Sequence, residues 1–147
     1  MEKKIADFIP ELADYYLLTD SGEVINQKNN KKLKIDEKHC YRLMLKSRKA
    51  KGFSVKTLMR EVYDINFYYD NTTPLEGEKW RYIPNTQYLY MCSNKGRIKS
   101  LRGVEAIIMK PHFSKKGEPR IQIVLPNEIE VTAPIKTFID EIWGSSL

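Results

Sequence analysis

The sequence predicts an α+β fold of two tandem repeats, each a small antiparallel β-sheet with one C-terminal amphipathic helix, and we expect the repeats to pack together. Three observations predict this fold: the chain resembles itself at a near-constant spacing, each half holds short β-rich runs between turn residues, and each half ends in an apolar stripe of helical period. The 147 residues suit one ordinary domain or two very small ones. A hydrophobic content of 41% with 30% charged residues is typical of soluble globular proteins.

The self-similarity consists of two alignments without gaps. They pair residues 8–26 with residues 82–100, at an offset of 74, and residues 41–63 with residues 121–143, at an offset of 80. The first alignment sets Ile9 over Ile83, and the change of offset gives the second half six inserted residues. Identity is low, but turn residues and apolar positions coincide, which indicates a duplicated unit.

A hairpin is predicted near the start of each half. Residues 19–22 and 93–96 are turn signals, in which Asp20 or Asn94 closes a side-chain turn and a glycine supplies positive φ. Downstream, residues 41–45 and 120–125 are short β-rich runs. Each is expected to pair across a polar loop with a second strand, one around Phe53 and the other around Val131.

A short helix is predicted to end each half. Apolar residues recur at i, i+3, i+4, i+7 and i+8 from Val55 and from Ile135, which defines one apolar helix face. Ser54 is the expected N-cap of the first helix, and Pro134 is expected in the first turn of the second. We expect both apolar faces to be core.

These elements give the domain boundaries. Residues 1–66 form the first, more diverged repeat, residues 67–77 a turn-rich linker or strap, and residues 78–147 the second repeat. Units of about 70 residues are marginally stable alone, which favours a shared interface.

The chain has the features of a cytoplasmic protein. Its apolar runs are far shorter than the roughly 18 residues that span a bilayer, and acidic residues lie where a signal peptide would be apolar. Cys40 and Cys92 lack CxxC spacing and are interpreted as small apolar side chains rather than a disulfide or metal site.

The charge is segregated along the chain. Residues 28–60 hold twelve basic residues against two acids, and residues 95–120 hold eight against two, although the net charge is only +6. Such segregation favours a polyanionic partner, most often nucleic acid, over a uniformly solvated surface.

The second half resembles the NUMOD4 module, a DNA-binding motif of phage-type HNH homing endonucleases. The resemblance covers most of residues 78–143 and is most specific from Trp80 to Leu101. The matching positions in that stretch are Trp80, Ile83, Tyr90, Ser93, Asn94, Gly96, Arg97, Ile98, Lys99, Ser100 and Leu101. Looser matches follow at Met109, Lys110 and Pro111 and at residues 135–138. Residues 5–66 resemble a diverged copy, with Ala6 at the tryptophan position and Glu23 at the arginine position.

The family's nuclease chemistry belongs to an HNH domain that follows the module, and this sequence departs from that pattern. It ends shortly after the second predicted helix, so we expect no HNH domain. Lys56 and Lys136 replace the family's helix-start histidine, and His39 and His112 lack the spaced acid, Asn and second His of a metal site. We therefore expect no catalysis, metal or cofactor; any activity would be that of an endonuclease.

The remaining prediction is a double-stranded DNA-binding protein of phage or mobile-element type. Arg97, Lys99 and Arg102, on one exposed edge, are the candidates for reading bases in the major groove. Ser93, Asn94 and Ser100 could orient a phosphate or read a base edge. The expected phosphate contacts are eight further basic residues from the two windows: Lys95, Lys110, Lys31, Lys32, Lys34, Arg42, Lys46 and Arg48.

Three alternatives remain open. A protein-interaction or inhibitor module could use exposed aromatics, for which the candidates are Phe67, Tyr68, Tyr69 and Tyr82. RNA could stack its bases on tyrosines. The chain could also be a remnant of an HNH endonuclease. No membrane partner is expected.

Overall fold

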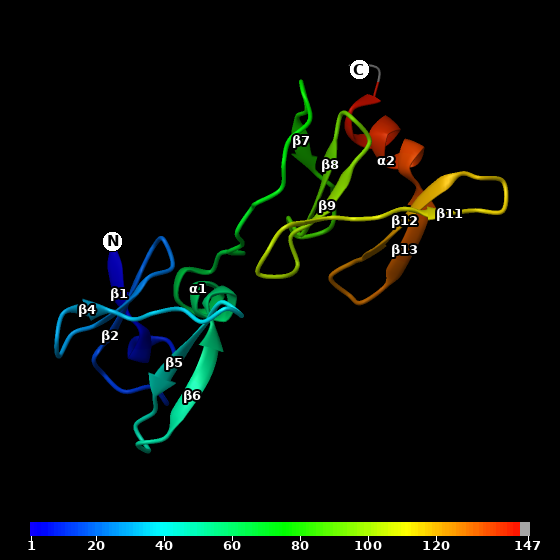
Figure 1. Cartoon of the computed structure of the whole chain (residues 1–147). Helices are drawn as coiled ribbons and strands as arrows, with labels where there is room; N and C mark the ends of the chain where they lie inside the picture. Colours follow the sequence, from blue (N-terminus) through cyan, green and yellow to red (C-terminus); the bar gives the residue numbers. More distant parts are fainter. Residues whose placement is uncertain (145–147) are drawn as a thin grey trace. The chain divides into compact units, whose positions relative to one another are not determined.

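The structure is a computed structural model that describes residues 1–144 (Figure 1). It divides into two units, residues 1–67 and residues 68–147, which are described separately below. Small antiparallel sheets and two α-helices make up these units, so the predicted α+β class is confirmed. None of the helices within residues 1–144 is long and apolar enough to cross a lipid bilayer.

Unit 1 contains one four-stranded sheet, one two-stranded hairpin and one helix. The sheet has the order β1-β2-β3-β4, formed by β1 (Glu2–Lys4), β2 (Tyr16–Thr19), β3 (Val24–Asn26) and β4 (Lys31–Lys32), with a 3-10 turn η1 (Ile5–Asp7) after β1. The hairpin pairs β5 (Cys40–Met44) with β6 (Ala50–Ser54), and helix α1 (Val55–Tyr63) follows at once.

Unit 2 has a similar order of elements, with an additional strand, β11, and no counterpart of η1 among its described residues. Its four-stranded sheet, β10-β9-β8-β7, is formed by β7 (Trp80–Tyr82), β8 (Tyr90–Ser93), β9 (Ile98–Ser100) and β10 (Ile107–Ile108). The second sheet consists of β11 (His112–Phe113), β12 (Pro119–Val124) and β13 (Glu130–Pro134), and helix α2 (Ile135–Ile142) follows. The helix lies beside these strands in the red and orange part of Figure 1.

Both predicted hairpin turns are confirmed, but Asp20 and Asn94 do not close them as expected. Asp20 Oδ2 lies 3.8 Å from the N-terminal ammonium, and Asn94 Oδ1 accepts from the Lys79 amide. Gly22 and Gly96 take φ values of 86° and 83°, in the region that favours glycine. The hydroxyl of the first turn residue completes each turn: Thr19 Oγ1 accepts from the Glu23 amide, and Ser93 Oγ from the Arg97 amide, both at 3.0 Å. These local bonds explain why the turn residues alone predict the hairpins.

The predicted helices are also confirmed, with one difference at a cap. Ser54 Oγ accepts a 3.0 Å hydrogen bond from the Thr57 amide, as an N-cap does. Pro134 does not lie in the first turn of α2; it precedes the first helical residue and ends β13. Its φ of −59° suits either position, so the sequence alone could not separate them.

Each unit has its own apolar core, and the predicted helix stripes contribute to both. Val55, Leu58, Met59 and Val62 of α1 are buried. In unit 2, Phe138 is buried, while other apolar residues of α2 are partly buried against the same cluster. The buried residues of this cluster are Ile83, Tyr90, Cys92, Ile98, Ile121, Ile123, Phe138 and Trp143.

Equivalent elements have the same register in the two units. The β2–β3 pairs recur in β8–β9 at an offset of 74, and the β5–β6 pairs recur in β12–β13 at an offset of 80. Side-chain bonds recur as well: the Tyr16 hydroxyl accepts from the Met44 amide at 3.0 Å, and the Tyr90 hydroxyl from the Val124 amide at 3.1 Å. The two units therefore share more than an order of elements.

The ungapped alignment of the first strands, however, is wrong. Glu2 pairs with Thr19 in the way that Trp80 pairs with Ser93, so Glu2 and not Ala6 occupies the tryptophan position. Ile5, directly after β1, is the buried counterpart of Ile83. The connection from there to β2 is four residues longer than the one to β8, because it contains η1.

Candidate nucleic-acid interface

Trp80 lies against the two basic residues of β9. The Lys99 ammonium is 4.1 Å from the centre of the tryptophan ring, and the Arg97 guanidinium carbon is 5.7 Å from it. Because Ile98 points into the core, its two neighbours point to the other face of the sheet. That face is not open: Lys99 is 4% exposed and the Arg97 side chain 24%. The expectation that both lie on an exposed edge is wrong.

Two carboxylates from the segment before β7 neutralise these cations. Arg97 donates from Nε and Nη2 to the two oxygens of Glu78, at 2.8 and 2.5 Å. Lys99 Nζ donates to Asp70 Oδ2 at 2.8 Å. Both carboxylates belong to a strap, residues 68–79, which also pairs through Tyr69 with the backbone of residues 104–106. The cations of β9 thus hold this strap on the sheet.

The ion pairs shift the pKa values of both carboxyls. The hydrogen bond from Arg97 lowers the pKa of Glu78 to about 2 and outweighs the opposing effect of burial. Burial alone would raise the pKa of Asp70, but hydrogen bonds from Lys99 and Thr72 outweigh it and lower the pKa. Both carboxylates are therefore charged at neutral pH, and their cations are already satisfied.

Ser93 and Asn94 also have structural partners. Ser93 is fully buried, and its hydroxyl accepts from the amides of Lys95 and Arg97. The Asn94 carboxamide accepts from the Lys79 amide at 2.9 Å and donates to the Gly77 carbonyl at 3.2 Å. These side chains fasten the hairpin turn and the strap, so neither points outward for a phosphate or a base.

Other predicted residues of unit 2 are accessible. Lys95, Arg102 and Lys110 are exposed and make no ion pair within residues 1–144. Ser100 is half-buried and accepts from the Arg102 amide at 3.4 Å. The structure adds Lys115 and Lys116, two exposed lysines in the turn between β11 and β12. Their Lys-Lys-Gly sequence is a turn signal with charge, which could have identified them.

In unit 1 the predicted cations are all exposed. Lys31 and Lys32 form β4, the edge of the sheet, and Lys34 follows it. Lys32 Nζ pairs with Glu23 at 2.7 Å, and this hydrogen bond lowers the pKa of Glu23. Since the pair lies at the surface, Lys32 can exchange its partner for a phosphate at little cost.

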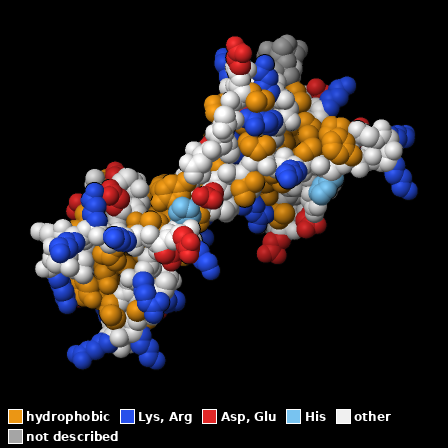
Figure 2. All heavy atoms as spheres, viewed as in Figure 1, with side chains coloured by type: hydrophobic (Ala, Val, Ile, Leu, Met, Phe, Trp, Pro, Cys, Tyr) orange, Lys and Arg blue, Asp and Glu red, His pale blue; other side chains and the backbone are white. Residues whose placement is uncertain are grey.

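The hairpin β5–β6 gathers the densest positive charge. Residues 40–54 contain five basic residues and no acid. Arg42 lies on the open face of β5, and Lys46, Arg48 and Lys49 surround the tip. Among the described residues, Lys46 lies 3.8 Å from Asp14 and Lys51 lies 3.5 Å from Glu11, and the other basic residues of this hairpin have no acidic neighbour there. Figure 2 shows Lys and Arg side chains at this tip, the lowest part of the view.

Within the described part of the chain the cysteines form no disulfide. Cys40 and Cys92 are free thiols, and burial raises the pKa of Cys92 to about 11. Within residues 1–144 no three His, Cys, Asp or Glu side chains lie close enough together to hold a metal ion.

The comparison with protein families found a match within the second unit. Residues 78–124 match the family model of the NUMOD4 motif. The chain contains a NUMOD4 motif. This motif is associated with DNA binding in homing endonucleases, and the match supports a general DNA-binding role. No curated protein and no solved structure matches the chain.

The structure explains what the most specific NUMOD4 positions do in this chain. Between Trp80 and Leu101, most of the matching side chains either fill the core or fasten the strap; Ser100 is half-buried and does neither. The NUMOD4 resemblance thus identifies a scaffold, and the accessible cations lie around it at less specific positions.

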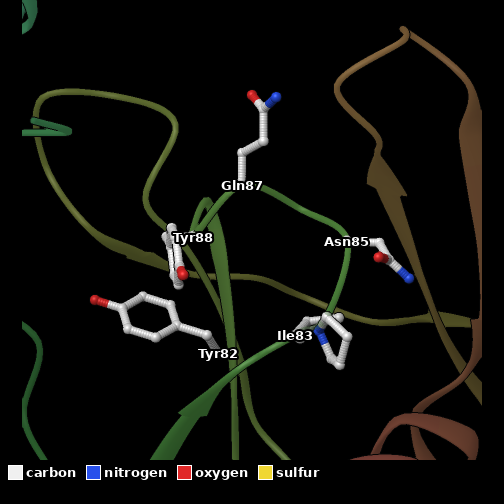
Figure 3. A pocket seen from close by; sticks show the side chains of 6 residues that line it. Tyr82, Ile83, Asn85, Gln87 and Tyr88 are labelled. Atoms are coloured by element: carbon white, nitrogen blue, oxygen red, sulfur yellow. The ribbon is translucent and has the colours of Figure 1, made fainter. Parts of the chain in front are cut away.

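A loop inside the NUMOD4 motif presents aromatic side chains. It connects β7 to β8 and bounds a pocket of about 380 Å³ lined by Tyr82, Ile83, Pro84, Asn85, Gln87 and Tyr88. The rings of Tyr82 and Tyr88 meet edge to face, with centres 5.1 Å apart, and are 43% and 69% exposed. In Figure 3 these rings lie together, whereas the carboxamides of Asn85 and Gln87 point outward from the loop.

This aromatic loop has an unusual backbone. Asn85, Gln87 and Tyr88 have φ values of 64°, 53° and 62°, a backbone region that residues other than glycine rarely adopt. Sequence patterns gave no sign of it. Of the aromatics expected to be exposed, only Tyr82 is; Phe67, Tyr68 and Tyr69 are half-buried.

Proposed function

We propose that this chain is a double-stranded DNA-binding protein of phage or mobile-element type that binds without cutting. The observation that supports it most directly is the surface distribution of charge around a NUMOD4 scaffold. Exposed Lys and Arg residues that have no acidic partner among residues 1–144 follow the hairpins and edge strands of both units, which suits contacts to a phosphate backbone.

The proposal assigns different roles to the predicted residues. Lys31, Lys34, Lys95, Arg102 and Lys110 are phosphate contacts, because they are exposed and make no ion pair within residues 1–144. Arg97 and Lys99 have no direct role; they maintain the surface by fixing the strap.

A second candidate is binding of single-stranded nucleic acid. The observation that favours it is the exposed pair Tyr82 and Tyr88, since bases stack on aromatic rings in a sequence-tolerant way. The aromatic loop would then be the main contact, and the cations would follow the strand.

The test is a fluorescence-anisotropy titration against a labelled mixed-sequence duplex at two salt concentrations, with magnesium present. We expect affinity that falls steeply with salt, and intact DNA on a denaturing gel afterwards. Unlabelled single strands of the same sequence should compete weakly. Strong competition would favour the second candidate, cut DNA would contradict binding without cleavage, and no binding at low salt would overturn the proposal.

A further inference from the structure

The hairpins β5–β6 and β12–β13 have the same register but opposite charge. Residues 40–54 contain five basic residues and no acid, whereas the equivalent residues 120–134 contain one basic residue and two acids. At the two tips Arg48 and Glu128 have nearly the same φ, 70° and 65°. A shared fold therefore does not require the positive charge of the first hairpin.

Gly52 is the second unusual feature of β5–β6. It lies in the middle of β6, opposite Arg42. Glycine weakens a strand at such a position, because the unfolded chain is most flexible at glycine and loses the most conformational entropy there on folding. Its φ lies outside the left-handed region, and a Cβ added to it would meet no atom within 4 Å in the described part of the chain. The equivalent residue of unit 2 is the exposed Thr132.

Nothing within unit 1 therefore requires glycine at this position. A glycine on an open strand face permits another molecule to approach the backbone closely. Gly52 and Ala50 leave the β6 half of the open face small-sided, beside the exposed Arg42 and Met44 of β5.

Lysines on an edge strand can also serve to prevent pairing with other chains. That explanation suits Arg42, Lys49 and Lys51, because both strands of a two-stranded sheet are edges, but it does not suit Gly52, which removes a side chain from the edge. A polyanion that lies across both strands accounts for all four residues.

We infer that the β5–β6 hairpin enters the major groove of duplex DNA, with Arg42 and Gly52 facing the base edges and the tip cations Lys46, Arg48 and Lys49 on the flanking phosphates. The major groove admits a two-stranded β-ribbon, and arginine there bonds guanine O6 and N7. This inference rests on the proposed function and moves base reading from β9, where Arg97 and Lys99 are neutralised, to unit 1.

The test uses the full chain and substitutes Gly52→Thr, which installs the residue that unit 2 has at this position. We expect the melting temperature to stay equal or rise, because threonine suits a strand, while affinity for a duplex selected from a randomised pool falls about tenfold. Gln122→Ala, on the same face of β12, is the matched control and should bind like the unchanged chain.

A second variant, Arg42→Gln, covers the case in which Gly52→Thr fails to fold. Its control is Arg60→Gln, which removes the same charge from the exposed side of α1. The selected duplex is then remade with 7-deazaguanine, which lacks only the N7 acceptor. The unchanged chain and Arg60→Gln should lose about tenfold in affinity on this duplex, and Arg42→Gln should lose almost none.

Each outcome is decisive. If the unchanged chain binds no duplex at all, both the proposed function and this inference fail. If it binds, but Arg42→Gln and a folded Gly52→Thr bind equally well, only the hairpin assignment fails. If the random pool yields no preferred duplex and 7-deazaguanine does not change the affinity, the protein contacts phosphates only. That result would overturn base reading.

Discussion

The two units show how one arrangement of strands can present opposite surfaces. Their hairpin turns, registers and buried side-chain bonds correspond: the Tyr63 hydroxyl donates to the Leu18 carbonyl at 2.6 Å, and the Trp143 indole to the Cys92 carbonyl at 3.2 Å. Their exposed residues do not correspond. The backbone and core therefore constrain the fold, while the open faces of the hairpins are free to differ.

The units also differ in where they use positive charge. In unit 2, Arg97 and Lys99 are paired with the strap, and the corresponding positions in unit 1 are Glu23 and Ile25. Unit 1 instead leaves its cations on hairpin β5–β6 and edge strand β4. A basic residue within a recognisable motif is thus not evidence of a contact until its partners are known.

Exchanging the charges of the two hairpins should have the largest effect. Arg48→Glu with Ala50→Glu copies unit 2 onto the first tip, removing one positive and adding two negative charges. We expect duplex affinity at low salt to fall on the order of a hundredfold, with a shallower salt dependence, because fewer phosphates are neutralised. Anisotropy titrations at several salt concentrations measure both quantities.

The control adds Glu128→Arg and Glu130→Ala to the same chain, which returns the net charge to +6. If the location of the charge matters, this fourfold variant should still bind poorly, because Thr132 occupies the open face of the second hairpin. Recovery of the full affinity would mean that net charge alone governs binding.

Removing the strap's carboxylate should have the next largest effect. Glu78→Gln removes the negative charge beside Arg97 in a mostly buried site and should lower the free energy of unfolding of unit 2 by about 2 kcal/mol. Glu23→Gln, which breaks the exposed pair with Lys32, should change nothing measurable. Chemical denaturation of the two variants measures the difference; equal effects would contradict it.

The same carboxylate predicts a pH dependence. The pKa of Glu78 is about 2 in the folded chain against 4.5 for the unfolded group, so the unfolded chain binds the proton first on acidification. Its contribution to stability should be complete above about pH 4.5 and should be lost as the pH falls towards 2. Glu78→Gln should be less sensitive to acid over this window.

Sequence reasoning predicted the elements better than the site. The hairpins, paired strands and helices were predictable because their signals are local: Gly22 and Gly96 in turns, Ser54 as a cap, apolar stripes of period 3.6. The neutralisation of Arg97 and Lys99 was not, because their partners lie 19 and 29 residues away along the chain.

The alignment of the first strands failed for a similar reason. A shared Ile-Pro pair suggested an ungapped match, but strand pairing, which is a long-range property, makes Glu2 the counterpart of Trp80. The aromatic loop was not predicted, because its three residues with positive φ are not glycines and the amino-acid composition does not reveal them. Gly52 acquires meaning only from its equivalence to Thr132.

The smallest expected effect tests the correspondence of the two cores. Tyr16→Phe and Tyr90→Phe each remove a hydroxyl that accepts from a strand amide, of Met44 in unit 1 and of Val124 in unit 2. Each should cost about 1 kcal/mol, since a part-buried amide loses its partner. Amide hydrogen exchange should accelerate at Met44 in the first variant and at Val124 in the second.

Because Arg102 also donates to the Tyr90 hydroxyl, at 3.4 Å, Arg102→Ala serves as control and should leave the Val124 amide protected. Unchanged exchange in one unit alone would show that the two bonds, though equivalent in geometry, differ in importance.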